Sequence, residues 1–144
     1  VLMIDLDNFK TLNDEHVHAK GDAVLKDVAA HVVGALRPSD IVCRYGGEEL
    51  LVILPDCGID DAMMRAEQVR ARIESLSEQH GCRVTASIGI ASIPETAKSS
   101  SDLLSASDAA LYEAKAMGKN QVHAAPPVMT KKAGENVTAR LVVS

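Results

Sequence analysis

The chain has 144 residues, of which 47% are hydrophobic and only 2% aromatic, and its formal net charge at pH 7 is −5. This length and apolar content suffice for one domain with a single aliphatic core. The negative charge and scarce aromatic rings argue against a nucleic-acid partner, because such proteins neutralise phosphates with Lys and Arg and stack bases on aromatic side chains.

The three cysteines, Cys43, Cys57 and Cys82, are odd in number and lack the close spacing of metal ligands. They fit reduced thiols in a cytoplasmic protein better than a disulfide framework. Cys43 lies within an apolar run, so we expect it in the core. No apolar run of the sequence is long enough to span a bilayer. We therefore predict a cytoplasmic chain that would reach a membrane only through upstream domains.

The first predicted elements are a short strand at residues 1–4 and, after a polar, loop-like stretch at residues 9–20 with room for one helical turn, a helix. Asp22 can cap this helix, which would run to about Leu36. Its apolar residues recur at three- and four-residue spacing and would form one stripe. The stripe consists of Val24, Leu25, Val28, Ala29, Val32, Val33 and Leu36.

Two apolar strands follow at about residues 41–46 and 50–54, and between them the sequence reads Arg-Tyr-Gly-Gly-Glu-Glu. This pattern predicts a hairpin with Gly46 and Gly47 in a tight turn, because glycine tolerates positive φ and leaves room for a group that approaches the backbone. A phosphate is the natural ligand for such a turn.

Acidic residues lie at the ends of two predicted strands. Glu48 and Glu49 would lie at the tip of the hairpin, and Asp5 and Asp7 follow the first strand. Two strand ends can thus present carboxylates to one point, an arrangement that suits hard divalent cations. The alternative is that these acids are solvated turn residues, since short motif matches carry a high risk of false positives.

The second half of the chain predicts a helix, a strand, a helix and a short strand. Asp60 or Asp61 would cap the first helix. Residues 83–91 alternate large apolar with small or polar side chains, as a strand does. The last helix is expected at about residues 101–117 and the last strand at 120–123. The buried face of the first helix would consist of Met63, Ala66, Val69, Ile73 and Leu76.

This order of elements predicts an α+β domain, with helices on one face of a mainly antiparallel sheet and a ferredoxin-like βαββαβ core. The layout is like the palm of nucleotide polymerases and cyclases. We expect residues 1–123 to form the domain. Residues 124–144 contain Pro126-Pro127 and a polar stretch at 130–138, which are typical of a linker or flexible tail.

Several segments resemble motifs of the GGDEF family of diguanylate cyclases, in the family's order and roughly its spacing. The family usually carries a helical segment just upstream, so we expect this chain to be a fragment that lacks it. The resemblance also implies the palm-like cyclase fold. The matching segments are Asp5-Leu6-Asp7-Asn8-Phe9-Lys10, Asn13-Asp14, Gly21-Asp22, Gly46-Gly47-Glu48-Glu49, Ala109-Ala110-Leu111-Tyr112-Glu113-Ala114-Lys115 and Gly118-Lys119-Asn120.

The resemblance implies condensation of two GTP molecules into cyclic di-GMP with release of two pyrophosphates. The metal would be Mg²⁺, or Mn²⁺ in its place, bound by Asp5, the backbone carbonyl of Leu6 and Glu48. Glu49 would lie beside them as a further catalytic acid. Carboxylates, phosphate oxygens and water are the ligands that Mg²⁺ prefers. Because one such site holds one GTP, the active species would be a homodimer.

The resemblance also implies that Asn13 and Asp22 hydrogen-bond the guanine edge. A carboxylate accepts from guanine N1 and N2, whereas adenine presents no matching pair of donors. Asp22 has the alternative role of a helix cap, and each candidate lysine, viewed alone, fits an ordinary surface residue. The other residues implied for GTP binding are Phe9, Lys10, Gly46, Gly47, Lys115 and Lys119.

Arg37-Pro38-Ser39-Asp40 matches the Arg-x-x-Asp pattern of the family's inhibitory site, which binds the cyclic di-GMP product. Arginine supplies a planar fork that suits a phosphate or a guanine edge. If Arg37 and Asp40 bind product, end-product inhibition follows. The alternative is an ion pair at a helix end.

Three positions depart from the family pattern: Val17 replaces Gly, Leu50 replaces Phe and Lys119 replaces Arg. A β-branched residue forced to positive φ would cost about 1–3 kcal/mol, and lysine lacks the bidentate fork of arginine. Val17 and the expected truncation motivate a rival hypothesis, a catalytically silent module that binds GTP or cyclic di-GMP and signals to a partner. A purely structural palm-like domain would bind no nucleotide.

Overall fold

The computed structural model describes residues 1–16 and 18–129. The departure at Val17 and the tail predicted at 130–144 lie outside the described residues. In chain order the elements are β1 (Leu2–Leu6), α1 (Phe9–Glu15), α2 (His18–Gly34), β2 (Ile41–Arg44), β3 (Glu49–Ile53), α3 (Ile59–His80), β4 (Ala86–Ile90), α4 (Ser100–Ala116) and β5 (Val122–Ala124).

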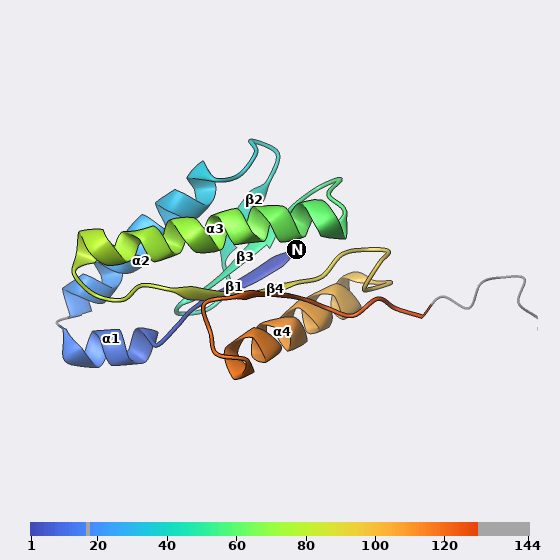
Figure 1. The fold of residues 1–144 in the computed structure, drawn as a ribbon. Coiled ribbons are helices and arrows are strands. Elements are labelled where there is room, and N and C mark those ends of the chain that lie inside the picture. The colour runs from blue at the N-terminus through green and yellow to red at the C-terminus, as the bar shows by residue number, and fades with distance from the viewer. Residues whose placement is uncertain (17, 130–144) are drawn as a thin grey trace, which may run out of the picture.

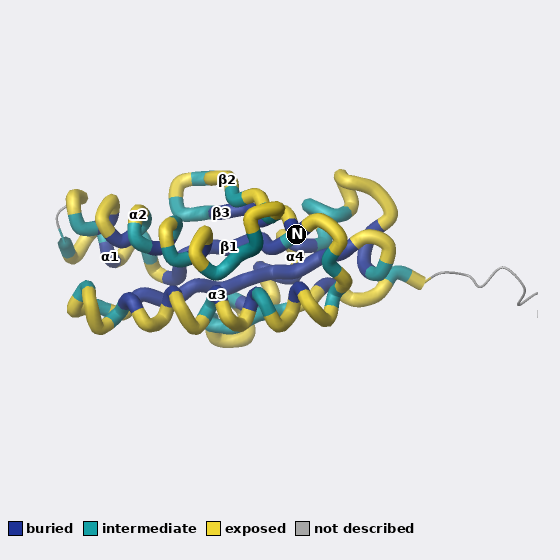
Figure 2. The backbone as a smooth tube through the Cα atoms, turned by 90° about the horizontal axis from the view of Figure 1, so that it is seen from above, coloured by how far each residue is buried: buried dark blue, intermediate teal, exposed yellow. Residues whose placement is uncertain are grey.

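The strands form one five-stranded sheet in the order β2-β3-β1-β4-β5. Every pairing is antiparallel except that of β4 with β5, which is parallel. All residues of β1 and β4 are buried, and Figure 2 shows the buried backbone following β1 through the middle of the domain. The predicted α+β class with a mainly antiparallel sheet is confirmed.

Helices cover both faces of this sheet, so the expectation that they lie on one face was wrong (Figure 1). Alternate side chains of β1 point to opposite faces. Ile4 belongs to the large core formed with α2 and α3, whereas Met3 packs with Leu51 and with Leu111 of α4. A central strand that is apolar on both faces needs a layer on each side, and α4 supplies the second one.

A glycine allows α4 to lie close to β4. A Cβ atom added at Gly89 would come within 2.1 Å of the backbone oxygen of Ser107 and 2.3 Å of the backbone nitrogen of Leu111. These are backbone atoms of α4, which a side-chain rotation cannot move aside. This helix carries Lys115, one of the predicted site residues.

The helix boundaries differ from the prediction at several points. The stretch expected as a loop contains α1, which buries Leu12. Because α2 begins at His18, Asp22 lies inside this helix and is not its N-cap. Gly58 caps α3, and Asp60 and Asp61 lie in its first turn, where negative charge interacts favourably with the helix dipole.

Three side chains predicted to lie in the core or in an apolar stripe are exposed, and the first is Val33 of α2, which is 58% exposed. Met63 of α3 is 36% exposed, because the inward stripe of this helix begins at Ala62 and Ala66. Cys43 lies exposed on β2, at the edge of a sheet whose α4 layer packs against β1, β4 and β5. Among the described helices, none has the length and apolar character needed to cross a membrane.

Candidate functional site

The hairpin between β2 and β3 is closed by its own backbone and by one arginine. The backbone nitrogens of Tyr45 and Gly46 both donate to the carbonyl of Glu49, at 2.8 and 3.3 Å. The guanidinium of Arg44 donates to the carbonyl oxygens of Gly46 at 3.2 Å and Gly47 at 2.7 Å. These bonds hold the diglycine turn in one shape.

The prediction gave the diglycine two roles, positive φ and room for a group near the backbone, and the structure lacks the positive φ. Among the described glycines, positive φ occurs at Gly81 and Gly118 and not in this turn. A Cβ atom at Gly46 would lie 2.6 Å from Oε2 of Glu49, whereas one at Gly47 would meet nothing within 4 Å. Gly46 therefore leaves room for a carboxylate, and Gly47 leaves open space for a ligand near the backbone.

Strand pairing brings the two acidic segments together. Asp5 of β1 lies opposite Glu49 of β3, and the backbone nitrogen of Leu6 donates to the carbonyl of Glu48 at 3.2 Å. Lys115 reaches this point from α4, with Nζ 2.9 Å from Oδ1 of Asp5. Segments far apart in the chain thus meet at one end of the central strands.

The ionised forms of Asp5 and Glu49 are unfavourable in the folded protein. Burial raises the pKa of Asp5, and the nearby charges of Glu48 and Asp7 add to this rise, while the bond from Lys115 only partly offsets it. Burial also raises the pKa of Glu49, and neighbouring Asp5 adds to the effect. A carboxyl whose folded pKa is raised contributes stability at low pH that is lost as the pH rises through that pKa. Further positive charge would relieve the ionised site.

The donor set at this point is all oxygen, which fits a hard divalent cation. Within residues 1–16 and 18–129, no three His, Cys, Asp or Glu side chains are grouped so that they could hold a metal ion by themselves. The predicted set of Asp5, Glu48 and the Leu6 carbonyl supplies only two carboxylates. Phosphate oxygens and water would have to complete the coordination, as is usual for Mg²⁺ at nucleotide sites.

A cavity of about 450 Å³ lies between α2 and the hairpin. Three of the predicted site residues, Asp22, Gly47 and Glu49, line it together. Lys26 and Arg44 also line this cavity, and the sequence analysis missed both as candidates. Two signals could have revealed them: Lys26 follows Asp22 by one helical turn, and Arg44 nearly adjoins the diglycine.

Asn13 and Phe9 both lie on α1. Asn13 is half-buried, and its Oδ1 is buried without a hydrogen-bond partner among the described residues. Phe9 is packed against the large core. An unpaired buried acceptor is costly, so this oxygen is a candidate for contact with a ligand.

The three candidate lysines have different surroundings in the structure. Lys115 contacts Asp5, whereas Nζ of Lys119 donates to Oδ1 of Asn8 at 2.6 Å. Lys10 is exposed in the first turn of α1. The structure thus brings one of the three into contact with the candidate metal ligands.

Arg37 and Asp40 form a closed pair in the loop after α2. Nε and Nη2 of Arg37 donate to Oδ1 of Asp40 at 3.2 and 2.9 Å, and Nη2 also donates to the carbonyl of Pro55 at 2.8 Å. Burial acts to raise the pKa of Asp40, but the bonds from Arg37 outweigh it and hold this pKa below its ordinary value. The ion pair considered as the alternative therefore exists, and the side chain of Arg37 remains 34% exposed.

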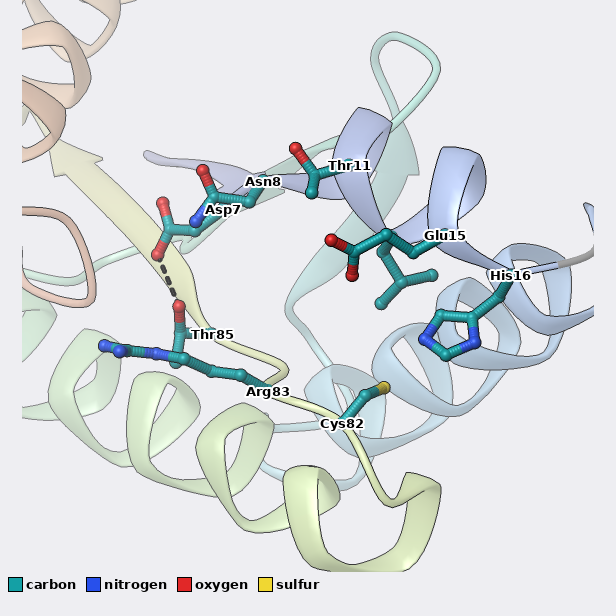
Figure 3. A pocket seen from close by; sticks show the side chains of 9 residues that line it. Asp7, Asn8, Thr11, Glu15, His16, Cys82, Arg83 and Thr85 are labelled. Carbon is teal, nitrogen blue, oxygen red and sulfur yellow. Dashed lines mark hydrogen bonds between the residues drawn. The ribbon is translucent and has the colours of Figure 1, made fainter.

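A second pocket, of about 300 Å³, opens beside α1, and Asp7 is the one of the four predicted strand-end acids that lines it (Figure 3). Asp7 lies at one end, with His16 and Cys82 at the other. The carboxylate of Asp7 is buried and accepts from the hydroxyls of Thr85 and Ser87 and from the backbone nitrogen of Asn120. Asp7 therefore ties β1 to β4 and to the loop after α4.

The chain is similar in sequence to a protein-family model and to curated proteins, and in fold to solved structures. Residues 1–121 match the family model described as diguanylate cyclase, GGDEF domain. The chain is 40% identical over 125 residues to Diguanylate cyclase A of Treponema denticola. The aligned region covers 85% of this chain and 34% of that protein. The chain thus spans about a third of the length of this curated relative.

Two solved structures share the fold. The active GGEEF domain of a diguanylate cyclase from Vibrio cholerae has a TM-score of 0.81 and 32% identity, covering 88% of this chain and 82% of that one. The GGDEF domain of DgcB from Caulobacter crescentus, in complex with c-di-GMP, has a TM-score of 0.76 and 30% identity, covering 85% and 75%. The family match, which extends over most of the chain, and the shared palm-like fold establish that this chain belongs to the GGDEF family.

Proposed function

We propose that this domain is a diguanylate cyclase, which condenses two GTP molecules into cyclic di-GMP and releases two pyrophosphates. The observation that carries the proposal is the meeting of Asp5 with the hairpin acids Glu48 and Glu49 at the end of paired strands. This acidic point adjoins a cavity that also contains Asp22. The family to which the chain belongs supports the same activity.

In this proposal one GTP occupies the cavity between α2 and the hairpin. Asp22 accepts hydrogen bonds from the guanine edge, and Leu25 supplies an apolar wall for the base. The triphosphate lies along the open backbone at Gly47 and near Lys115, whose charge is placed at the acidic end of the sheet. The residues of α2 therefore orient the base, while the hairpin and α4 orient the phosphates.

Asp5, the carbonyl of Leu6 and Glu48 would hold Mg²⁺ or Mn²⁺. A divalent ion bound there would neutralise triphosphate charge and lower the pKa of an attacking hydroxyl. The 3′-hydroxyl of each nucleotide forms a bond to the α-phosphorus of the other, and the bond from that phosphorus to pyrophosphate breaks. Because each domain holds one GTP, two copies must meet face to face for both bonds to form.

Arg37 and Asp40 support a further proposal, product binding that inhibits the enzyme. Asp40 and Pro55 hold the guanidinium of Arg37 in a fixed orientation on the surface. A fork held in place loses less conformational freedom when it binds a phosphate or a guanine edge. The exposed part of Arg37 is thus prepared for an anionic ligand.

The metal assignment predicts the effect of two substitutions that remove charge and keep shape. Glu48→Gln and Asp5→Asn should each lower cyclic di-GMP formation at least about 100-fold, because each removes a carboxylate that would hold the metal ion, and the charge of that ion would stabilise the transition state. Both should leave the unfolding temperature equal or higher, since each relieves the repulsion between the buried carboxylate of Asp5 and the charge of Glu48. The measurement is separation of products by chromatography, with identification by mass, after incubation with GTP and Mg²⁺.

This assay needs two formats because turnover requires a pair of domains. The 144-residue chain and a fusion to a dimeric coiled coil should be compared, with Glu78→Gln on the exposed face of α3 as the matched control. Wild-type rates in either variant would defeat the metal assignment. Nucleotide binding without any pyrophosphate release by the wild-type fusion would instead select the silent binding module.

The ion pair of Lys115 with Asp5 leads to a prediction about pH. Lys115→Met removes the interaction that lowers the pKa of Asp5, so ionised Asp5 becomes less favourable in the folded state. The deficit in unfolding temperature relative to wild type should therefore be larger at pH 8 than at pH 5. GTP affinity should also fall about 10-fold or more, as expected when a charged hydrogen bond is lost.

Thermal unfolding at the two pH values and calorimetry with GTP test this prediction. Lys98→Met, which removes an exposed lysine before α4, is the matched control. A deficit that does not depend on pH, together with unchanged GTP affinity, would show that Lys115 has neither role.

The product site predicts that Arg37→Ala weakens binding of cyclic di-GMP at least about 10-fold, because the charged fork contributes hydrogen bonds of this strength. Calorimetry with cyclic di-GMP measures this affinity, and Arg72→Ala on the exposed face of α3 serves as the control. Equal affinities of wild type and Arg37→Ala would place product binding elsewhere.

A further inference from the structure

The presence of glycine at position 21 is not explained by the helix in which it lies. Gly21 is buried within α2, where glycine is a poorer helix former than alanine. Its backbone does not require glycine either, because the positive-φ glycines among the described residues are Gly81 and Gly118. The reason for glycine must therefore lie in what contacts this position.

The amide of Asn13 occupies the space that a side chain at position 21 would fill. A Cβ atom at Gly21 would lie 1.8 Å from Oδ1 and 2.9 Å from Cγ of Asn13, and 3.3 Å from Cζ of Phe9. The first two distances are impossible contacts, so any larger residue would push the amide away. Asn13 and Phe9 are both on α1, and Gly21 is thus where α1 meets α2.

The other glycine of the same helix shows that this requirement is local. A Cβ atom at Gly34 would meet only Nη1 of Arg72 at 3.6 Å, which is an ordinary van der Waals distance. Alanine would fit there without displacing anything. The two glycines share one helix but differ in what they contact, which makes Gly34 a matched reference.

The Asn13 amide is held in place without internal hydrogen bonding of its oxygen. Oδ1 is buried and accepts no bond from the described residues, a state that natural proteins avoid unless a ligand or water supplies a donor. The residue after Gly21 is Asp22, which lines the large cavity. The residue that the Asn13 amide contacts is therefore the chain neighbour of a carboxylate that lines the cavity.

We propose that Gly21 is a positioning residue for base recognition. Its missing side chain lets the Asn13 amide lie against α2 beside Asp22, so that the two polar groups meet one purine edge together. The inference rests on the proposed function, in which the ligand is a guanine nucleotide. Guanine suits this pair because its edge offers donors at N1 and N2 together with the acceptor O6.

Alanine at position 21 should separate the two groups rather than unfold the domain. The displaced atoms belong to the short, terminal amide of Asn13, which can rotate away. Asp22 stays on α2 and keeps its place in the cavity. The variant should therefore lose selectivity for guanine, because a site built to hydrogen-bond a base discriminates only while its polar groups are in position.

A double-mutant cycle in the nucleotide-free 144-residue chain tests the contact itself. Gly21→Ala should lower the unfolding temperature of the wild-type chain, because the amide is displaced. In the background of Asn13→Ala, which removes the amide, the same substitution should lower it much less or raise it, because the better helix propensity of alanine is then opposed only by the 3.3 Å contact with Phe9. Gly34→Ala should leave the temperature equal or raise it in both backgrounds. A rise with Gly21→Ala in both backgrounds would overturn the proposal.

Calorimetric titration with GTP and with ATP then tests recognition. Gly21→Ala should weaken GTP binding at least about 10-fold while ATP binding changes little, and the double variant should bind GTP no worse than Asn13→Ala alone. Wild-type GTP affinity in Gly21→Ala, or losses that add fully in the double variant, would contradict the positioning role.

The unfolding and the binding measurements together distinguish the failure of this inference from the failure of the proposed function. If the wild-type chain binds GTP but Gly21→Ala changes the unfolding temperature equally in both backgrounds, only the role of Gly21 is refuted. If the wild-type chain binds no guanine nucleotide, even as a dimeric fusion, the proposed function fails and the recognition role fails with it.

Discussion

The antiparallel pairing of β1 with β3 determines most of what this domain can do. It sets Asp5 opposite Glu49 and brings Leu6 to the carbonyl of Glu48. Burial and mutual repulsion raise the pKa of Asp5, and Lys115 offsets only part of this effect. A protein that holds ionised acids in this way gives up stability, which is a common feature of sites that bind cations or charged substrates.

Missing side chains recur where this fold brings functional groups together. Gly46 leaves room for the carboxylate of Glu49, and Gly89 lets α4 approach β4 so that Lys115 reaches Asp5. Gly21 leaves room for the amide of Asn13. In each case the glycine serves a close approach between elements rather than an unusual backbone angle, since none of the three has positive φ.

Much of this architecture could be predicted from the sequence, because apolar periodicity is a local property. The helical stripes of α2 and α3, the hairpin and the acidic strand ends all follow from spacing alone. The family resemblance of residues 109–115 led to the prediction that Lys115 contributes to the site, and Nζ of this lysine lies 2.9 Å from Oδ1 of Asp5. The resemblance to a known family then supplied roles that no periodicity contains.

Features that depend on tertiary contacts were missed or misassigned. The position of α4 on the second face depends on Gly89, which sequence periodicity does not distinguish from any other strand glycine. Cys43 is exposed because β2 is an edge strand, and edge position is a property of the whole sheet. Lys26 and Arg44 belong to the candidate site because α2 and the hairpin line one cavity, which is a property of the folded chain.

The most direct test of this account is a crystal structure of the domain with Mn²⁺ and a GTP analogue that cannot be cleaved. The anomalous scattering of manganese identifies the ion without assumptions about its ligands. We expect the ion between the carboxylates of Asp5 and Glu48, with the triphosphate beside it. An ion bound elsewhere, with no contact to Asp5 or Glu48 in a domain that holds the nucleotide, would contradict this account.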